Sequence, residues 1–200
     1  MGGRLNEKKR DGEVFLARII LFAVVGAVTG AAAVEPIGLL STENQQLRAM
    51  FTLPGLIFGV AFSVALLRFK FVSMAAAFAY VAASTLSHMA AVTTVLAIGP
   101  INPSFPILDL LSGRAGFSFT GFSAGAVGGD LLADATALLI KRLQWPLLIV
   151  TGAVLGAFLP LTDLGLGGFF LFYAIWQAGY AATLAAILPR AADKLARLST

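Results

Sequence analysis

The sequence predicts an all-α membrane protein, a bundle of six transmembrane helices with both the N- and C-termini in the cytoplasm. Of its 200 residues, 58% are apolar and only 12% are charged, whereas soluble domains have roughly 45–50% and about 25%. The apolar residues form long blocks, and about 20 such residues cross the hydrocarbon of a bilayer. The basic residues stand in short clusters between these blocks, which is the pattern that membrane topology requires.

Composition also excludes several functions. The chain has no cysteine, which excludes disulfides, thiolate metal sites and cysteine nucleophiles. A single histidine cannot supply paired axial haem ligands. We find no phosphate-binding loop, no zinc motif and no aromatic and basic platform for nucleic acid. We therefore expect no cofactor, no metal and no nucleic-acid partner, and we favour a protein that is not an enzyme.

Six apolar blocks meet or approach the length of a membrane span. The third block extends either to Val92 or to Ile98, and the fifth is short for a crossing. Pro54 lies near the start of the second block, where its missing N–H would be unpaired in any case. The blocks are Phe15–Val34, Phe51–Leu67, Phe71–Val92, Phe117–Ile140, Trp145–Leu161 and Gly168–Leu188.

Basic residues set the predicted orientation, because cytoplasmic loops carry an excess of Lys and Arg. With the N-terminus inside, only Arg48 and Arg114 lie outside. Residues 1–14 then form a basic cytoplasmic N-terminus, 15–188 the transmembrane domain and 189–200 a cytoplasmic tail. We expect the bacterial inner (plasma) membrane. The inside set is Arg4, Lys8, Lys9, Arg10, Arg18, Arg68, Lys70, Lys141, Arg142, Arg190, Lys194 and Arg197.

An alternative for the N-terminal region is a cleaved signal peptide, with Arg4–Arg10 as its basic part and Ala31–Ala33 as its cleavage site. The apolar stretch from Phe15 is longer than the usual 7–15 residues. We therefore favour a first transmembrane helix over a removed leader.

Two predicted outer loops contain helix signals. Thr42 followed by Gln45 is a capping-box pattern, which starts a short helix before the second span or belongs to a solvated connector. In the loop 99–116, Pro106 and Gly113 suit one or two helical turns in the outer interface. A lid over an outward cavity is the other interpretation of that loop.

Small residues recur along several predicted helices. Close backbone approach across small side chains supplies much of the attraction between helices in lipid. This pattern indicates dense packing, either inside one chain or between subunits. The candidate packing glycines are Gly26, Gly30, Gly121, Gly125, Gly129, Gly152 and Gly156.

Asp130 and Asp134 are one turn apart on the fourth predicted helix, so they share a face. By helix rise they lie about 15 Å and about 9 Å from its inner end. A central Asp costs about 2.5 to 3.5 kcal/mol, so such residues normally face the bundle interior or a water-filled cavity. We interpret the pair as a transport or proton-relay site, or as carboxylates that bond neighbouring helices.

His88 is the other ionisable group inside a predicted span, with Ser and Thr residues around it. A hydrogen-bonded packing histidine is the favoured interpretation. The alternative is a polar position on a transport pathway, a role that Ser123 and Gln177 could share.

The segment Gly121-Phe-Ser-Ala-Gly125 resembles the serine motif of rhomboid proteases, which pair a serine on helix four with a histidine on helix six. Here Ser123 matches the serine, and Gln177 stands at the histidine position. Glutamine is not a general base, so the serine would lack activation. The resemblance implies an inactive rhomboid-like scaffold.

The preferred function is transport of a solute or of protons, with lipid and a small-molecule or ion substrate as partners. In size and span number the chain also resembles the substrate-binding subunits of energy-coupling-factor vitamin transporters. That resemblance implies that the small residues of helix one dock a partner. The alternative is a non-catalytic subunit of a larger membrane complex, a homo-oligomer or an assembly with other subunits, that uses the glycine ridges as contact faces.

Overall fold

The computed structural model describes residues 2–99, 118–140, 143 and 145–188, and it describes side chains from Gly12 onward. Six α-helices and one 3-10 helix make up this part of the chain, and they confirm the predicted all-α membrane bundle. The helices are α1 (Gly2–Gly38), α2 (Glu43–Arg68), α3 (Met74–Ile98), α5 (Phe119–Leu139), α6 (Pro146–Gly156), η3 (Leu159–Leu164) and α7 (Leu166–Ile187).

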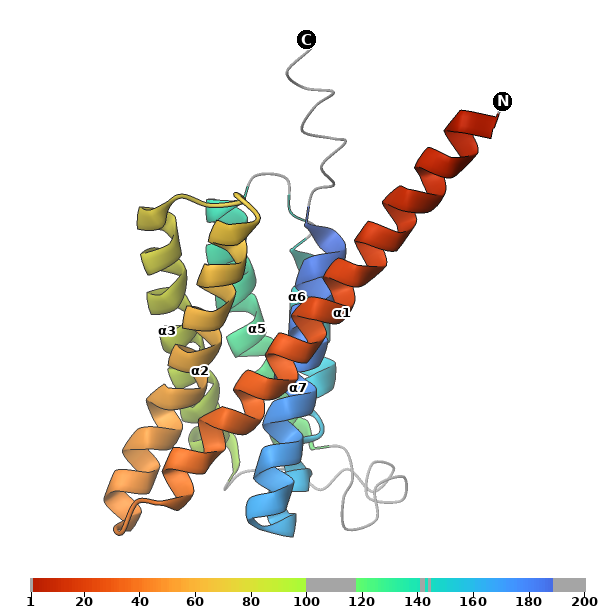
Figure 1. Ribbon diagram of the computed structural model, residues 1–200. Helices are drawn as coiled ribbons and strands as arrows, with labels where there is room; N and C mark the ends of the chain where they lie inside the picture. Colours follow the sequence, from red (N-terminus) through yellow and green to blue (C-terminus); the bar gives the residue numbers. More distant parts are fainter. Residues whose placement is uncertain (1, 100–117, 141–142, 144, 189–200) are drawn as a thin grey trace.

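The helices form a closed ring. Each one packs against the next in the sequence, and α7 packs back along α1 (Figure 1). The start of α1 and the end of α7 lie at the same end of the bundle, where Arg18 Nη2 donates a hydrogen bond to the carbonyl of Leu188 at 3.1 Å. We name this the inner end, after its predicted cytoplasmic location, and the opposite end the outer end.

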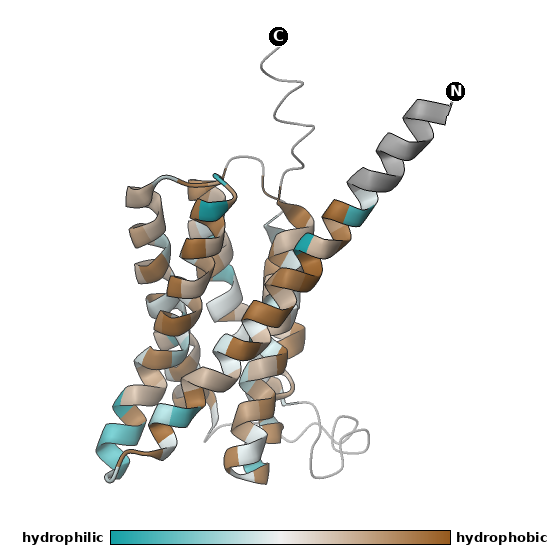
Figure 2. Cartoon of the chain, in the orientation of Figure 1, coloured by the Kyte–Doolittle hydropathy of each residue, from teal (hydrophilic) through white to brown (hydrophobic). Residues whose placement is uncertain are grey.

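The described helices have the properties of an integral membrane protein. Five stretches are long and apolar enough to cross a membrane: Gly12–Gly38, Glu43–Arg68, Met74–Ile98, Pro146–Leu164 and Leu166–Ile187. Large apolar side chains are exposed on the helix faces that point away from the centre of the bundle. Hydrophilic residues gather mostly toward the two ends of the bundle (Figure 2). Helix α5, which is rich in glycine and carries two aspartates, completes the ring; its 21 residues are enough to span a membrane, but it is less apolar than the five stretches above.

Helix α2 begins earlier than the apolar block predicts. Thr42 is its N-cap, and its side chain accepts a hydrogen bond from the Gln45 backbone N–H at 3.3 Å. The predicted helix start at Thr42 is therefore confirmed over the solvated connector, but the helix is continuous with the second span and not a separate short helix. One correction follows: Pro54 lies inside the helix and not in its first turn, because the cap starts the helix well before the apolar block.

Serine caps set the starts of α3 and α5. Ser73 accepts a hydrogen bond from Ala76 N at 3.3 Å, and Ser118 accepts one from Gly121 N at 3.1 Å. The two helices begin two or three residues after the predicted Phe71 and Phe117, because these hydroxyls pair with free N–H groups of the first turn. At its other end α3 reaches Ile98, which is the longer of the two alternatives.

The fifth predicted span is wrong as one continuous helix. Helix α6 ends at Gly156, and the chain continues through a turn into the 3-10 helix η3, which includes Pro160. Proline removes a backbone donor and clashes with the preceding turn, which breaks a regular α-helix. Together the two helices provide the stretch Pro146–Leu164.

Several predictions fall outside the described residues. These are the helical turns or lid between Pro106 and Gly113, the position of Arg114 and the tail 189–200. The basic N-terminal segment, expected as a separate region, continues α1, which is helical from Gly2.

The inner half of the ring is filled by large side chains. Phe62 and Leu66 of α2, Tyr80 of α3 and Leu184 of α7 are fully buried in one cluster. Phe62 stacks on Phe58 with ring centroids 4.3 Å apart. Offset and edge-to-face aromatic pairs of this kind are favourable beyond their buried area. This cluster is a packed core, and a groove lined by residues of α1 and α2 lies beside it.

Candidate functional site

Glycines bring α5 and α6 into backbone contact. A Cβ on Gly152 would lie 3.0 Å from the Gly129 Cα, and a Cβ on Gly125 would lie 2.9 Å from the Gly156 Cα. Real Cβ atoms are rarely that close to a neighbouring backbone, so these positions need glycine. The ridge formed by Gly121, Gly125 and Gly129 therefore packs against α6 of the same chain.

The small residues of α1 are also in contact with another helix of the chain, α7. A Cβ on Gly26 would lie 2.9 Å from the Ala178 Cα, and one on Gly30 would lie 2.8 Å from the Ala174 backbone nitrogen. Within the described chain α7 covers this ridge, and docking of a partner through α1 stays a prediction.

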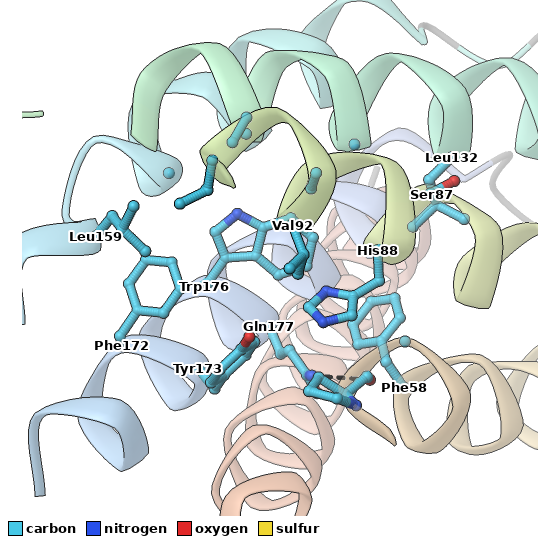
Figure 3. Close-up of a pocket in the computed structure, with 18 of the residues that line it drawn as sticks. Phe58, Ser87, His88, Val92, Leu132, Leu159, Phe172, Tyr173, Trp176 and Gln177 are labelled. Atoms are coloured by element: carbon cyan, nitrogen blue, oxygen red, sulfur yellow. Dashed lines mark hydrogen bonds between the residues drawn. The ribbon is translucent and has the colours of Figure 1, made fainter. Parts of the chain in front are cut away.

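A cavity lies in the outer half of the ring, and we name it the outer cavity. Its volume is about 70 Å³, which exceeds the roughly 10–15 Å³ that one water molecule needs. Figure 3 shows its labelled side chains converging from the surrounding helices. The lining residues are Pro54, Gly55, Phe58, Ser84, Ser87, His88, Ala91, Val92, Val95, Gly121, Ala124, Gly125, Gly128, Leu132, Gly156, Leu159, Phe172, Tyr173, Trp176 and Gln177.

His88 replaces a missing backbone hydrogen bond in the facing helix α2. Pro54 has no N–H, so the carbonyl of Met50, four residues earlier, loses its helical donor. His88 Nε2 donates to this carbonyl at 2.8 Å. A carbonyl only accepts, so Nε2 carries the proton, and Nδ1 is an acceptor in the uncharged ring. The histidine therefore joins α3 to α2 and also borders the cavity, which supports the packing interpretation.

Gln177 joins three helices. Its Nε2 donates to the carbonyl of Pro54 on α2 at 3.2 Å, and its Oε1 accepts from the Thr29 hydroxyl on α1 at 2.8 Å. The side chain is 1% exposed. A buried amide needs such partners, because an unpaired polar group costs about 1–3 kcal/mol. Gln177 thus fixes the wall of the outer cavity at the level of Pro54.

Two serines complete the polar part of the α3 wall. Ser84 Oγ donates to the Gly55 carbonyl at 2.7 Å, across the close contact between α3 and α2. Ser87 Oγ donates to the Ala83 carbonyl of its own helix at 2.7 Å. Both hydroxyl protons are used inside the protein, which leaves oxygen lone pairs at the cavity.

Aromatic side chains form the α7 wall. The ring centroids of Tyr173 and His88 are 5.7 Å apart, and Trp176 stacks on Tyr180 at 5.4 Å. Phe172 packs edge-on to Tyr173 at 5.3 Å. Aromatic walls with a few placed polar groups are typical of small-molecule sites.

Asp130 and Asp134 do not border the outer cavity. Both are exposed on the outer face of α5, whose opposite face carries the buried Gly128, Gly129 and Leu132. The expectation that the pair faces the bundle interior is therefore wrong within the described chain. The glycine-rich face of α5 is what packs against α3 and α6, and this turns the carboxylates outward.

Ser123 and Gln177 are not brought together as a rhomboid-like pair. Ser123 is half-buried and does not line the outer cavity, while Gln177 bonds Thr29 and Pro54. Within the described residues no three His, Asp or Glu side chains gather into a possible metal site.

The sequence pointed to His88 and Gln177 but not to their shared cavity, and it gave no sign of the aromatic wall of Phe172, Tyr173 and Trp176. One signal was present: a proline inside α2 leaves a carbonyl that a histidine at the same depth can satisfy. No family model matches the chain, and neither a curated protein nor a solved structure is matched by it.

Proposed function

We propose that this integral membrane protein binds a small solute in the outer cavity, as the binding step of a transport-type function. The observation that carries the proposal is a cavity in the outer half of the ring that is lined by residues of α2, α3, α5, α6 and α7. Binding sites between the helices of bundles usually combine an apolar wall with a few convergent polar groups. His88, Ser87 and Tyr173 are groups of that kind here.

The solute-binding proposal does not depend on the two aspartates. Because Asp130 and Asp134 lie outside the cavity, neutral substitutions at these positions should leave solute binding unchanged. Their role in a proton relay stays a separate prediction. It is tested by measuring proton-linked uptake of the Asp130→Asn and Asp134→Asn variants in proteoliposomes.

A cavity-filling variant tests solute binding across a panel of chemically different solutes. Val92 lines the cavity, and Leu96, one turn farther along α3, is exposed and does not. Purified protein in lipid nanodiscs would be screened against charged, uncharged and apolar solutes by thermal shift. We expect at least one solute to stabilise the wild type and the Leu96→Phe control but not Val92→Phe. The proposal fails if every stabilising solute acts equally on both variants.

A second function, as a subunit of a larger membrane complex, is favoured by the outward position of Asp130 and Asp134. Carboxylates within an apolar span are costly unless they are paired. A helix of another chain that offers a basic or hydrogen-bonding group would satisfy them. The contact face in this proposal is the carboxylate face of α5, because the glycine ridges are covered.

Native mass spectrometry from mild detergent tests the assembly proposal. We expect a complex that is lost in the Asp130→Asn, Asp134→Asn double variant and kept in Leu131→Ala, since Leu131 is exposed on the same helix and carries no charge. A wild-type protein that is a clean monomer would contradict it.

A further inference from the structure

The described residues that line the outer cavity carry no formal charge. None of them is Asp, Glu, Lys or Arg. Burying a charged group without a partner in an apolar site is far more costly than burying a neutral polar one. The cavity therefore favours an uncharged ligand.

Hydrogen-bonding capacity differs between the two walls of the cavity. On α3, Ser84, Ser87 and His88 each use a proton on a backbone carbonyl, so they present acceptors. On α7, the indole N–H of Trp176 and the phenol O–H of Tyr173 have no acceptor among the described residues, so they present donors. A ligand that meets both walls needs a donor on one edge and an acceptor on the other.

The shape of the cavity narrows the class of ligand further. Phe58, Phe172, Tyr173 and Trp176 offer aromatic faces and edges, which pack well against a flat ring. The volume of about 70 Å³ suits a compact molecule and not a lipid chain. The labelled rings of Tyr173, Trp176 and His88 lie around one space in Figure 3.

We propose that the outer cavity selects a compact, uncharged, planar ligand that carries both a hydrogen-bond donor and an acceptor, the chemistry of an aromatic carboxamide or a cyclic amide. This inference rests on the proposed solute-binding function. The amide N–H groups would bond the acceptors of the α3 wall, and the amide carbonyl would accept from the α7 wall.

Tryptophan fluorescence provides a direct test. The chain has two tryptophans, and Trp145 is exposed outside the cavity. In the Trp145→Phe variant, emission comes from Trp176 alone. Three single-ring probes would be titrated in nanodiscs: benzamide, benzoate, which is charged, and toluene, which has no hydrogen-bonding group. The same variant with Val92→Phe added reports the background from partition into lipid.

We expect a saturable change in emission with benzamide, and weaker binding of benzoate and toluene. Ser87→Ala should weaken benzamide binding by about fivefold, as expected for the loss of one hydrogen bond. Thr93→Ala is the matched control, because Thr93 makes the same bond to its own helix, at 2.8 Å to the Met89 carbonyl, but is exposed outside the cavity. Each of these results supports the proposal.

Equal or tighter binding of benzoate or toluene would overturn the ligand class, and so would an absence of benzamide binding. Solute binding itself is judged separately by the screen with Val92→Phe. If that screen finds only charged or purely apolar solutes, the proposed function stands and the ligand class is wrong. If the screen finds no solute whose effect is lost in Val92→Phe, the proposed solute-binding function is itself wrong.

Discussion

The two halves of the bundle contrast in how the same ring of helices is filled. Toward the inner end, Phe62, Leu66, Tyr80 and Leu184 are fully buried against one another. Toward the outer end, the same helices enclose the outer cavity. The difference lies in the side chains that point into the ring.

Small residues account for the open outer half. Gly121, Gly125, Gly128, Ala91 and Ala124 line the cavity, and they provide little volume toward the centre of the ring. In lipid, glycine allows backbones to approach closely. Gly121 and Gly125 therefore tighten the α5–α6 contact, Gly128 tightens the α5–α3 contact, and these small residues leave space beside the contacts. Dense packing between helices and an internal cavity are thus compatible in one structure.

The largest expected effect on stability comes from a substitution in the packed core of the inner half. Leu66→Ala should lower the free energy of unfolding by about 2–5 kcal/mol, because it removes a fully buried side chain and leaves a hole. Leu159→Ala, at the border of the outer cavity, should cost only about 1–2 kcal/mol, since part of that side chain already faces open space. Reversible unfolding in mixed micelles measures both values. Equal costs would show that the outer half is packed like the inner half.

Substitution of a contact glycine should have the next largest effect. A Cβ on Gly152 meets the backbone of Gly129 at 3.0 Å, so Gly152→Ala should cost about 1–3 kcal/mol as α5 and α6 separate. Gly167 lies in α7 with open space around it. There, Ala should stabilise the helix by up to about 1 kcal/mol, because it reduces the entropy lost on folding. The same unfolding assay applies, and a loss of similar size at both positions would contradict the close contact.

The smallest expected effect, a coupling of about 1 kcal/mol, tests the hydrogen bond that connects the cavity wall to α2. His88→Ala should cost about 1–3 kcal/mol, because the Met50 carbonyl loses its donor. In a Pro54→Ala background the restored N–H can pair with that carbonyl, so the same substitution should cost about 1 kcal/mol less. A double-mutant cycle of unfolding free energies measures the coupling. Additive costs would show that the histidine does not compensate for the proline.

The fold was predictable to a large extent, and the site only in part. Long apolar blocks and the division of basic residues predict six helices, and Thr42 identifies the true start of α2. His88 and Gln177 stood out as polar residues inside spans. Their common cavity did not, because it depends on which helices are neighbours and on how each one is rotated. The sequence pattern does not determine that rotation for helices that are apolar on all sides.

Asp130 and Asp134 show most clearly what the sequence determined and what the tertiary structure decided. Helical periodicity alone places both carboxylates on one face of α5. Whether that face points inward depends on the competing glycine face, because backbone contact with α3 and α6 is available only there. Composition thus determined that the chain lies in a membrane and where its helices run. Packing of small residues decided which face of each helix borders the cavity, which is buried in the core and which is exposed on the outside of the bundle.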